Sequence, residues 1–255
     1  MANKVMAGCS TEVKMSGFVS SNLSCIPATA VNLIDEVDAT SNPTMLRITE
    51  IFYSLQGEAR TSGLPTAFVR LTGCPLRCSY CDSEYAFYGG VKKSLDEVLA
   101  EVAGFGAHYV CVTGGEPLAQ KACIPLLKAL CDAGYEVSLE TAGALDIAAV
   151  DPRVSRVVDI KTPGSSESHK NRLANLALLT PHDQLKFVLC DRADFDWAKA
   201  FIAEHGLFSR CEVLFSASFK QLAPKDLADW ILSDRLPVRF QLQAHKYLWG
   251  DLPGH

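Results

Sequence analysis

Apolar positions recur with two different periods along the chain after Met45. Short apolar runs typical of buried strands are separated by segments in which apolar residues recur at helical spacing. The short runs predict seven strands, at residues 67–73, 108–115, 135–141, 156–162, 182–189, 211–218 and 237–243. The helical segments predict four helices, at residues 94–104, 122–134, 194–206 and 224–234. Ser94 and Glu97 have the spacing of a capping box, which supports the start of the first helix.

Strands that alternate with helices are typical of a parallel sheet covered by helices. Seven strands are fewer than the eight of a closed barrel. The predicted fold class is therefore α/β, an open, partial TIM-like (β/α) barrel with a mostly parallel sheet. In such folds the functional residues lie at the carboxyl ends of the strands. The segments expected at those ends are residues 72–73, 113–117, 140–141, 159–162 and 216–218.

Residues 1–44 show neither period and are rich in Ser, Ala, Asn and Thr. Two interpretations stay open for them. They form a poorly ordered N-terminal extension in front of a domain that starts at Met45, or they are a loose surface segment of that domain. We assign residues 45–255 to a single domain, which fits the total length of 255 residues.

Composition narrows the class of protein. The chain has 48% hydrophobic and 21% charged residues and a net charge of -5, so tight nonspecific binding to DNA or RNA is not expected. No apolar run approaches the roughly 18 residues of a membrane span, and no secretory signal is expected. Of the ten cysteines, Cys111, Cys131 and Cys190 lie in apolar strand or helix segments, where a free thiol packs as a small hydrophobe. We therefore expect a reducing, cytoplasmic setting.

Three cysteines, Cys74, Cys78 and Cys81, are spaced C-x3-C-x2-C in the segment "GCPLRCSYCDSEYAF". Thiolates bind soft metals, but a structural zinc site needs four ligands and no second C-x2-C occurs in the chain. A four-iron cluster held by three cysteines keeps one iron open for a ligand that is not protein. Two alternatives stay open: a zinc site completed by a distant Cys or His, and chance clustering of buried thiols. Pro75 and Arg77 indicate an exposed loop, which weakens the second.

This spacing, with Tyr80 just before the last cysteine, resembles the signature of the radical S-adenosylmethionine (SAM) enzymes. In that family three cysteines hold a [4Fe-4S] cluster, SAM chelates the fourth iron, and an electron from the cluster generates a 5′-deoxyadenosyl radical. The open (β/α) barrel is also the fold of that family. The segment "TGGEP" resembles the family motif that receives the SAM amino group, and it implies SAM contacts at Gly114, Gly115 and Glu116.

Seven blocks of sequence narrow the resemblance to the 7-carboxy-7-deazaguanine synthase (QueE) family. They are residues 52–74, 81–87, 112–117, 139–143, 159–165, 183–188 and 243–250. The resemblance implies a radical SAM lyase that converts 6-carboxy-5,6,7,8-tetrahydropterin to 7-carboxy-7-deazaguanine with loss of ammonia, on the route to queuosine and other 7-deazapurines. The reaction implied starts with loss of the hydrogen at C6 and continues with contraction of the ring.

The polar residues of these blocks suit such a substrate. Gln56 and Glu58 can pair with the guanine-like edge of a pterin, and Arg70 offers a two-pronged donor for its carboxylate. In the family the substrate pocket is lined by residues that match Leu55, Gln56, Gly57, Arg70 and Thr113 here. The alternatives are that Arg70 is a surface charge on a strand and that "SLQGE" is a polar turn.

The resemblance also implies Mg²⁺, for which the family uses a Thr after the Cys-Asp of the cluster loop. This chain has Ser83 at that position, which keeps a hydroxyl oxygen for a hard cation, and Asp82 is the alternative ligand. Further SAM contacts are implied at the later strand ends, which could instead simply cap helices. These residues are Glu140, Ile160, Lys161, Thr162, Phe215, Ser216, Ala217 and Ser218.

The implied partners are a small carboxypterin substrate, an electron donor such as flavodoxin, and a second copy of the chain in a homodimer. Residues 245–250, "HKYLWG", are expected to close the pocket or to form part of a dimer surface. Two rival functions stay open. One is an activating enzyme for glycyl-radical enzymes, which shares the cysteine spacing, and the other is a zinc or scaffold protein without enzymatic activity.

Overall fold

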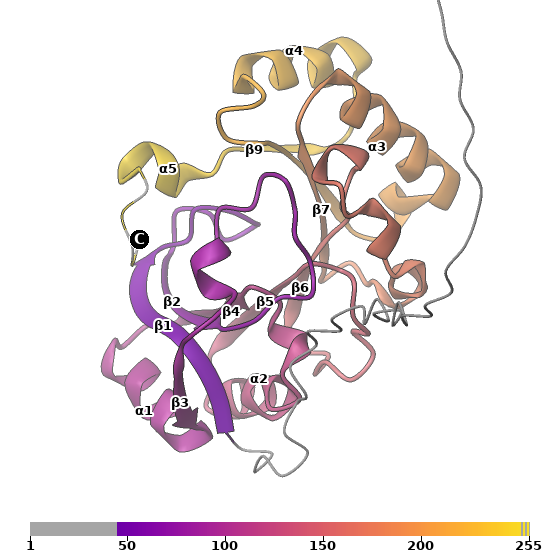
Figure 1. Cartoon of the computed structure of the whole chain (residues 1–255). Coiled ribbons are helices and arrows are strands. Elements are labelled where there is room, and N and C mark those ends of the chain that lie inside the picture. Colours follow the sequence, from indigo (N-terminus) through magenta and orange to yellow (C-terminus); the bar gives the residue numbers. More distant parts are fainter. Residues whose placement is uncertain (1–44, 251, 253, 255) are drawn as a thin grey trace, which may run out of the picture. The chain divides into compact units, whose positions relative to one another are not determined.

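The computed structural model describes residues 45–250, 252 and 254, so the extension proposed for residues 1–44 lies outside the described residues. Within the described residues, nine strands form one sheet in the order β3-β1-β2-β4-β5-β6-β7-β8-β9 (Figure 1). Seven neighbouring strands of this sheet are parallel and appear in chain order. They are β2 (Pro65–Leu71), β4 (Tyr109–Gly114), β5 (Glu136–Thr141), β6 (Ser155–Asp159), β7 (Gln184–Leu189), β8 (Glu212–Ala217) and β9 (Arg239–Gln241). All seven strands predicted from the sequence are confirmed, with boundaries that differ by a few residues.

Two further strands precede this parallel set at one edge of the sheet. β1 (Met45–Leu55) pairs antiparallel with β2 and with β3 (Val91–Ser94). The sequence pattern did not predict them as strands. β1 carries polar or half-buried residues over much of its length, and β3 is short and has two lysines, so neither has the continuous apolar run that marked the others. The sheet has two free edges, at β3 and β9, and is open, as predicted.

The four predicted helices are confirmed as α1 (Leu95–Gly104), α2 (Cys123–Asp132), α3 (Arg192–His205) and α4 (Pro224–Asp234). The capping box at α1 is present: Ser94 N donates to Glu97 Oε2 (2.6 Å), and Glu97 N donates to Ser94 Oγ (3.2 Å). A fifth helix, α5 (Ala244–Leu248), was not predicted. Short 3₁₀ turns complete the connections: η1 (Glu84–Ala86), η2 (Pro117–Ala119), η3 (Pro163–Ser165), η4 (Ser168–Lys170), η5 (Leu173–Leu178) and η6 (Leu207–Ser209).

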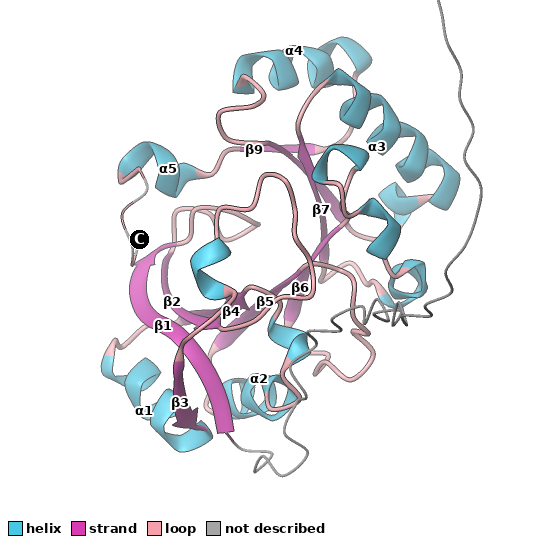
Figure 2. Cartoon of the chain, viewed as in Figure 1, coloured by secondary structure: helices cyan, strands magenta, loops and turns pink. Residues whose placement is uncertain are grey.

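The helices α1 to α4 lie along the outside of the curved sheet (Figure 2). Each turns an apolar stripe toward the sheet, as the helical spacing requires. The buried residues of these stripes include Val98 and Val102 of α1, Leu126, Leu127 and Leu130 of α2, and Phe195 and Ile202 of α3. Because the core lies between helices and sheet, the inner face of the sheet and the carboxyl ends of its parallel strands are left for other roles. No helix among the described residues is long and apolar enough to cross a membrane.

Candidate active site

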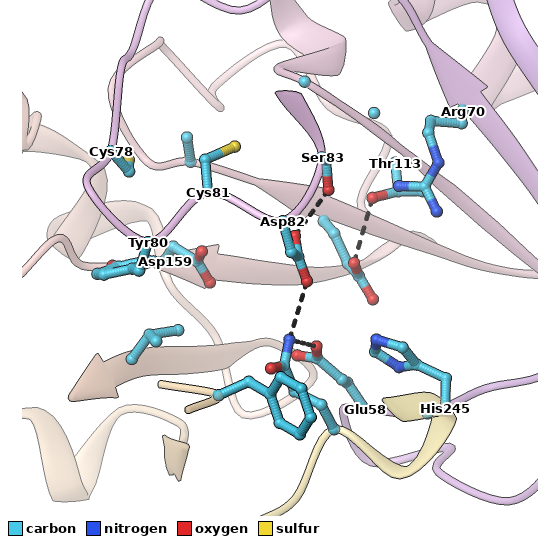
Figure 3. Close-up of a pocket in the computed structure, with 18 of the residues that line it drawn as sticks. Glu58, Arg70, Cys78, Tyr80, Cys81, Asp82, Ser83, Thr113, Asp159 and His245 are labelled. Atoms are coloured by element: carbon cyan, nitrogen blue, oxygen red, sulfur yellow. Dashed lines mark hydrogen bonds between the residues drawn. The ribbon is translucent and has the colours of Figure 1, made fainter. Parts of the chain in front are cut away.

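A cavity of about 740 Å³ opens at the carboxyl ends of the parallel strands. It is bordered by the cysteine loop after β2, by the end of β1, and by the C-terminal segment around α5 (Figure 3). Most of the predicted site residues line it: Leu55, Gln56, Gly57, Glu58, Arg70, Cys74, Cys78, Tyr80, Cys81, Ser83, Thr113, Gly114, Gly115, Glu140, Lys161 and Ser218. Residues predicted separately as cluster, SAM and substrate contacts therefore share one cavity.

The cysteine loop is held by one backbone hydrogen bond at its base and by another between its second and third cysteines. Gly73 N donates to Ala86 O (2.8 Å), and Ser79 N donates to Ser165 O (3.0 Å). Burial raises the pKa of Cys74 and Cys78, and it raises that of Cys81 to about 11. At neutral pH the thiols alone therefore keep their protons, and only a bound metal would convert them to thiolates.

The donor set of this loop suits an iron–sulfur cluster with one open iron. All three cysteines are free and half-buried at the cavity wall. Across the part of the chain that is described, no three His, Cys, Asp or Glu side chains converge closely enough to hold a single metal ion. The ligands of a four-iron cluster bind different iron atoms and do not have to converge on one point.

The glycines of "TGGEP" let the end of β4 approach the cysteine loop closely. Gly114 has a φ of +154°, and a Cβ there would overlap the Leu71 carbonyl oxygen. A Cβ at Gly115 would overlap the Gly73 carbonyl oxygen and lie 2.8 Å from the Cβ of Cys74. Only glycine fits at both positions without moving the backbone at the end of β2 or at the start of the loop.

Glu116 follows these glycines but does not line the cavity. It is fully buried, and its carboxylate accepts hydrogen bonds from Leu118 N (2.9 Å), Ala142 N (2.7 Å) and Thr141 Oγ1 (2.9 and 2.8 Å). Its side chain thus joins the end of β4 to the end of β5. A contact between Glu116 and SAM stays a prediction.

Arg70 lies on the cavity wall in a fixed orientation. It pairs with Glu50 across the β1–β2 ladder, and its Nε donates to Glu50 Oε1 (2.6 Å). Tyr85 OH donates to the same oxygen (2.8 Å), and the guanidinium lies 5.7 Å from the ring centres of Phe52 and Tyr85. The side chain of Arg70 is 15% exposed, so it is not a surface charge. Burial would lower its pKa, but Tyr85 and Glu50 outweigh burial and raise it.

Near Arg70, the side chains of Gln56, Thr113 and Glu140 form a hydrogen-bonded group. Gln56 Nε2 donates to Glu140 Oε1 (3.2 Å), and Thr113 Oγ1 donates to Glu140 Oε2 (3.2 Å, Figure 3). Burial raises the pKa of Glu140, and the opposing charge of Lys186 does not cancel this effect. The structure therefore brings Glu140, predicted as a SAM contact, to the two residues predicted as substrate contacts.

The opposite wall of the cavity holds a network of buried charges. Lys186 forms an ion pair with Glu58 and lies 3.9 Å from Asp159 Oδ1, while Lys161 Nζ donates to Asp159 Oδ2 (2.7 Å). Gln243 Nε2 also donates to Glu58 Oε1 (3.0 Å). Burial alone would lower the pKa of Lys186, but Asp159 and Glu58 raise it well above its usual value.

Lys186 and Asp159 were not among the predicted site residues. Lys186 could have been predicted from the sequence, because it is a lysine in the middle of the apolar strand segment "QLKFVL". Such a residue is buried only when it is paired. Asp159 ends β6 and so lay within a segment that was expected at the functional edge.

Ser83 and Asp82 present oxygen atoms to the cavity side by side. Ser83 Oγ donates to Asp82 Oδ1 (2.8 Å), and Gln243 Nε2 donates to Asp82 Oδ2 (3.2 Å, Figure 3). Burial would raise the pKa of Asp82, but the Ser83 hydrogen bond and the charges of Lys246 and Lys186 lower it. Both residues remain candidate ligands for a hard cation.

Besides Glu116, five predicted SAM residues do not line the cavity: Ile160, Thr162, Phe215, Ser216 and Ala217. Phe215 packs in the core against Phe187 and Phe195, at centroid distances of 5.6 and 5.8 Å. Thr162 Oγ1 donates to Asp194 Oδ2 (2.8 Å), which ties the end of β6 to α3. Contacts between these five residues and SAM stay predictions, while Lys161 and Ser218 from the same strand ends do line the cavity.

The C-terminal segment forms one side of the cavity. Ala244 N donates to Gly57 O (3.0 Å), and a Cβ at Gly57 would overlap the ring of His245. His245, Lys246 and Gly250 line the cavity, as expected if this segment closes the pocket. His245 was not predicted individually, because its approach to Gly57 joins positions far apart in the sequence.

Known proteins resemble this chain over most of its length. The profile of the Radical SAM superfamily matches residues 68–160. A relative from Chlorobaculum tepidum named 7-carboxy-7-deazaguanine synthase is 49% identical over 213 residues, which are 82% of this chain and 97% of the relative. One of the same name from Koribacter versatilis is 46% identical over 219 residues, which are 80% of this chain and 97% of the relative.

The fold also has a solved counterpart. The crystal structure of QueE from Escherichia coli aligns with a TM-score of 0.65 at 20% identity and covers 81% of this chain and 100% of that one. At this identity the match shows the shared fold alone. The sequence relatives decide the family: the chain belongs to the 7-carboxy-7-deazaguanine synthase family of the radical SAM superfamily.

Proposed function

We propose that the protein is a radical SAM lyase that converts 6-carboxy-5,6,7,8-tetrahydropterin to 7-carboxy-7-deazaguanine with loss of ammonia. The observation that carries the proposal is the single cavity in which three cysteine thiols share a wall with Gln56 and Arg70. The relatives support it, because they match nearly their whole length to this chain and are named for this product. They do not favour the alternative of an activating enzyme for glycyl-radical enzymes.

The cysteines would bind the iron–sulfur cluster, and the neighbouring strand ends would bind SAM. Cys74, Cys78 and Cys81 would hold the [4Fe-4S] cluster, and Gly114 and Gly115, which line the same cavity, would contact SAM. When bound, the cluster and SAM supply the radical chemistry that removes a hydrogen from the substrate.

The remaining polar residues would bind and orient the substrate. Glu50 occupies the Nε of Arg70, so the two Nη groups are available as a planar pair of donors for the pterin carboxylate. Gln56, Thr113 and Glu140 together present donors and acceptors for the guanine-like edge of the ring. A fixed orientation matters because a radical abstracts only the hydrogen that is held next to it.

The buried ion pairs on the opposite wall of the cavity would act on the substrate through a fixed electrostatic field. Lys186 and Lys161 hold Glu58 and Asp159 in place, so these groups need not reorganise during the reaction. The aromatic rings of Phe52 and Phe68, stacked at 4.8 Å, line another part of the cavity and limit the access of water. The chain itself thereby positions the substrate and shields it.

Mg²⁺ is part of the proposal as a further cofactor. The hydroxyl of Ser83 and the carboxylate of Asp82 offer two hard oxygen donors on the cavity wall. A cation there would help to orient a carboxylate of the substrate. We assign the ligand role to Ser83, with Asp82 as its hydrogen-bonded support.

We further propose the extent of the domain, the oligomeric state, the location and the electron donor of the enzyme. Residues 45–255 would form the radical SAM domain, in agreement with the share of the chain that the relatives match. The enzyme would act in the cytoplasm as a homodimer and take electrons from a donor such as a flavodoxin. Sedimentation analysis tests the dimer, and turnover by a chain that starts at Met45 tests the domain boundary.

Anaerobic incubation with SAM, a reductant, Mg²⁺ and the carboxypterin tests the main proposal. We expect the deazaguanine product and ammonia in equal amounts, measured by liquid chromatography and mass spectrometry. The Cys78→Ala variant should lose both the iron–sulfur absorption and the product, because a cluster cannot be held by two of the three ligands. Product formation by a cluster-free protein would refute the assignment.

Arg70→Ala should retain the cluster spectrum but raise KM for the carboxypterin about ten- to hundredfold, which is the effect expected from loss of a charge-assisted contact. Glu50→Gln should raise KM less, because it loosens Arg70 without removing the guanidinium. Steady-state kinetics measure both. An unchanged KM in Arg70→Ala would mean that the substrate carboxylate binds elsewhere.

Ser83→Ala should weaken the stimulation of activity by Mg²⁺, because the hydroxyl donor is lost. Ser83→Thr, the matched control, should keep that stimulation, since it restores the oxygen with one added methyl group. Titration of the rate with Mg²⁺ measures the difference. Identical Mg²⁺ curves for wild type and Ser83→Ala would move the metal to Asp82 or away from this loop.

A further inference from the structure

The loop between β1 and β2, residues 56–64, reaches strands that are not its neighbours in the sheet. It is closed at its base, where Gln56 N donates to Leu64 O (2.9 Å). Beyond this base, the backbone of Ala59 and Arg60 binds side chains of β9 and β7. Three strands, β4 to β6, separate β2 from β7, so the loop bridges the inner side of the curved sheet.

Two buried glutamines bind consecutive backbone groups of this loop. Gln241, the last residue of β9, accepts a hydrogen bond at its Oε1 from Ala59 N (2.8 Å). Gln184, the first residue of β7, accepts one at its Oε1 from Arg60 N (2.6 Å). The two glutamines are 5% and 2% exposed. Loss of such a bond is costly, because the buried partner is left unsatisfied.

Ala59 has a backbone conformation that its own sequence does not favour. Its φ is +63°, in the left-handed region that favours glycine, and the residue is 3% exposed. A strained residue persists only where the surrounding structure determines its conformation. The hydrogen bonds from Ala59 N and Arg60 N supply this constraint, so the loop is held by strands far away in the sequence.

Gln241 also holds a carboxylate of the cavity wall. Its Nε2 donates to Glu58 Oε2 (3.1 Å), the oxygen that is paired with Lys186. Gln243 Nε2 donates to the other oxygen of Glu58 (3.0 Å, Figure 3). Glu58 lines the cavity, whereas Gln241 and Gln184 do not. The amide of Gln241 therefore connects the loop backbone to a side chain that faces the cavity.

The side chain of Arg60 attaches the loop at a third point. Its Nε donates to Glu212 Oε2 (3.2 Å), at the start of β8. Its Nη groups donate to the carbonyl oxygens of Pro181, His182 and Asp183, at 3.4, 3.3 and 3.4 Å. These carbonyls precede β7, so this contact lies at the amino ends of the strands. The loop is thus attached to β7, β8 and β9 together.

We propose that Gln241 and Gln184 are positioning residues: they hold the β1–β2 loop across the sheet so that Gln56 and Glu58 face the guanine-like edge of the substrate. The proposal rests on the proposed function, which supplies that substrate. Both glutamines act through the loop, because neither lines the cavity. A loop that is ordered before the substrate arrives loses little entropy on binding. Loss of an anchor should therefore appear as weaker binding of the substrate.

The test uses the full-length, cluster-loaded enzyme and three anchor variants. Gln241→Met keeps a side chain of similar length but removes the hydrogen bonds to Ala59 N and Glu58. Gln241→Glu keeps an acceptor for Ala59 N and places a second carboxylate against Glu58. Gln184→Met removes the anchor at Arg60 N and does not touch Glu58. If one of them does not fold, the others still test the loop.

Arg239→Gln is the matched control on the same strand. Arg239 forms an ion pair with Glu212 (2.7 Å), so this variant weakens β9 at its start and leaves the glutamine contacts in place. Steady-state kinetics give KM and kcat for the carboxypterin. Hydrogen–deuterium exchange of residues 56–64 reports the order of the loop without any turnover, and thermal unfolding reports the stability of the fold.

We expect Gln241→Met to raise KM about tenfold, which is the effect of losing a buried hydrogen bond, and to keep the kcat and the cluster spectrum of the wild type. Gln241→Glu should also raise KM, because the new carboxylate repels Glu58. Gln184→Met should raise KM by a smaller factor. In all three variants residues 56–64 should exchange faster than in the wild type.

A second substitution tests the role of the strained residue. Ala59→Gly combined with Gln241→Met should recover part of the lost KM, because glycine adopts a φ of +63° without an anchor. Arg239→Gln should keep the wild-type KM and exchange rate, even where it lowers the melting temperature. A contact that only stabilised the fold would lower the melting temperature and leave KM unchanged.

Unchanged KM in the Gln241 and Gln184 variants of an active enzyme would overturn the proposal and leave the proposed function intact. An equal rise of KM in Arg239→Gln would also overturn it, because general weakening of β9 would then explain the effect. Absence of product from the wild type would contradict the proposed function instead. In that case, unchanged exchange of residues 56–64 in Gln241→Met would separately refute the anchoring of the loop.

Discussion

The close approach of β4 to the cysteine loop is the constraint on which the rest of the site depends. Gly114 and Gly115 bring their backbone against the carbonyl groups of Leu71 and Gly73, at a distance that leaves no room for a Cβ. Glu116 N then donates to Gly73 O (2.7 Å) and fixes the contact. The loop that carries the three thiols is therefore positioned by a strand and not by its own sequence alone.

A second constraint is electrostatic. The cavity holds the acids Glu58, Glu140 and Asp159, which burial makes costly unless cations lie close to them. Lys186 and Lys161 supply those cations for Glu58 and Asp159. These pairings raise the pKa of both lysines, whereas at Glu140 burial prevails and raises the pKa of the carboxyl group. A network of this kind adds little to stability on average, so its value lies in holding fixed charges around a reacting molecule.

Features that depend on local sequence pattern, such as strands, helices and the cysteine loop, can be predicted from the sequence. Contacts that depend on the register between strands cannot. The parallel strands and α1 to α4 have clear periods and caps, and the spacing of the cysteines marks the loop without any structure. Glu50 could not be predicted, because it meets Arg70 only through the antiparallel pairing of β1 with β2. Phe215 shows the converse: the end of β8 was placed correctly, but the side chain of Phe215 faces the core.

The end of β4 and Gly115 just after it position the loop that holds the cluster, and Gly115→Ala removes the close approach on which this depends. Gly104→Ala is the matched control, because a Cβ there meets no atom within 4 Å. Iron and sulfide content after anaerobic reconstitution, measured with the cluster absorption, gives the answer. We predict that Gly115→Ala folds but loses most of its cluster, whereas Gly104→Ala keeps the full amount. A full cluster in Gly115→Ala, with normal turnover, would contradict the account.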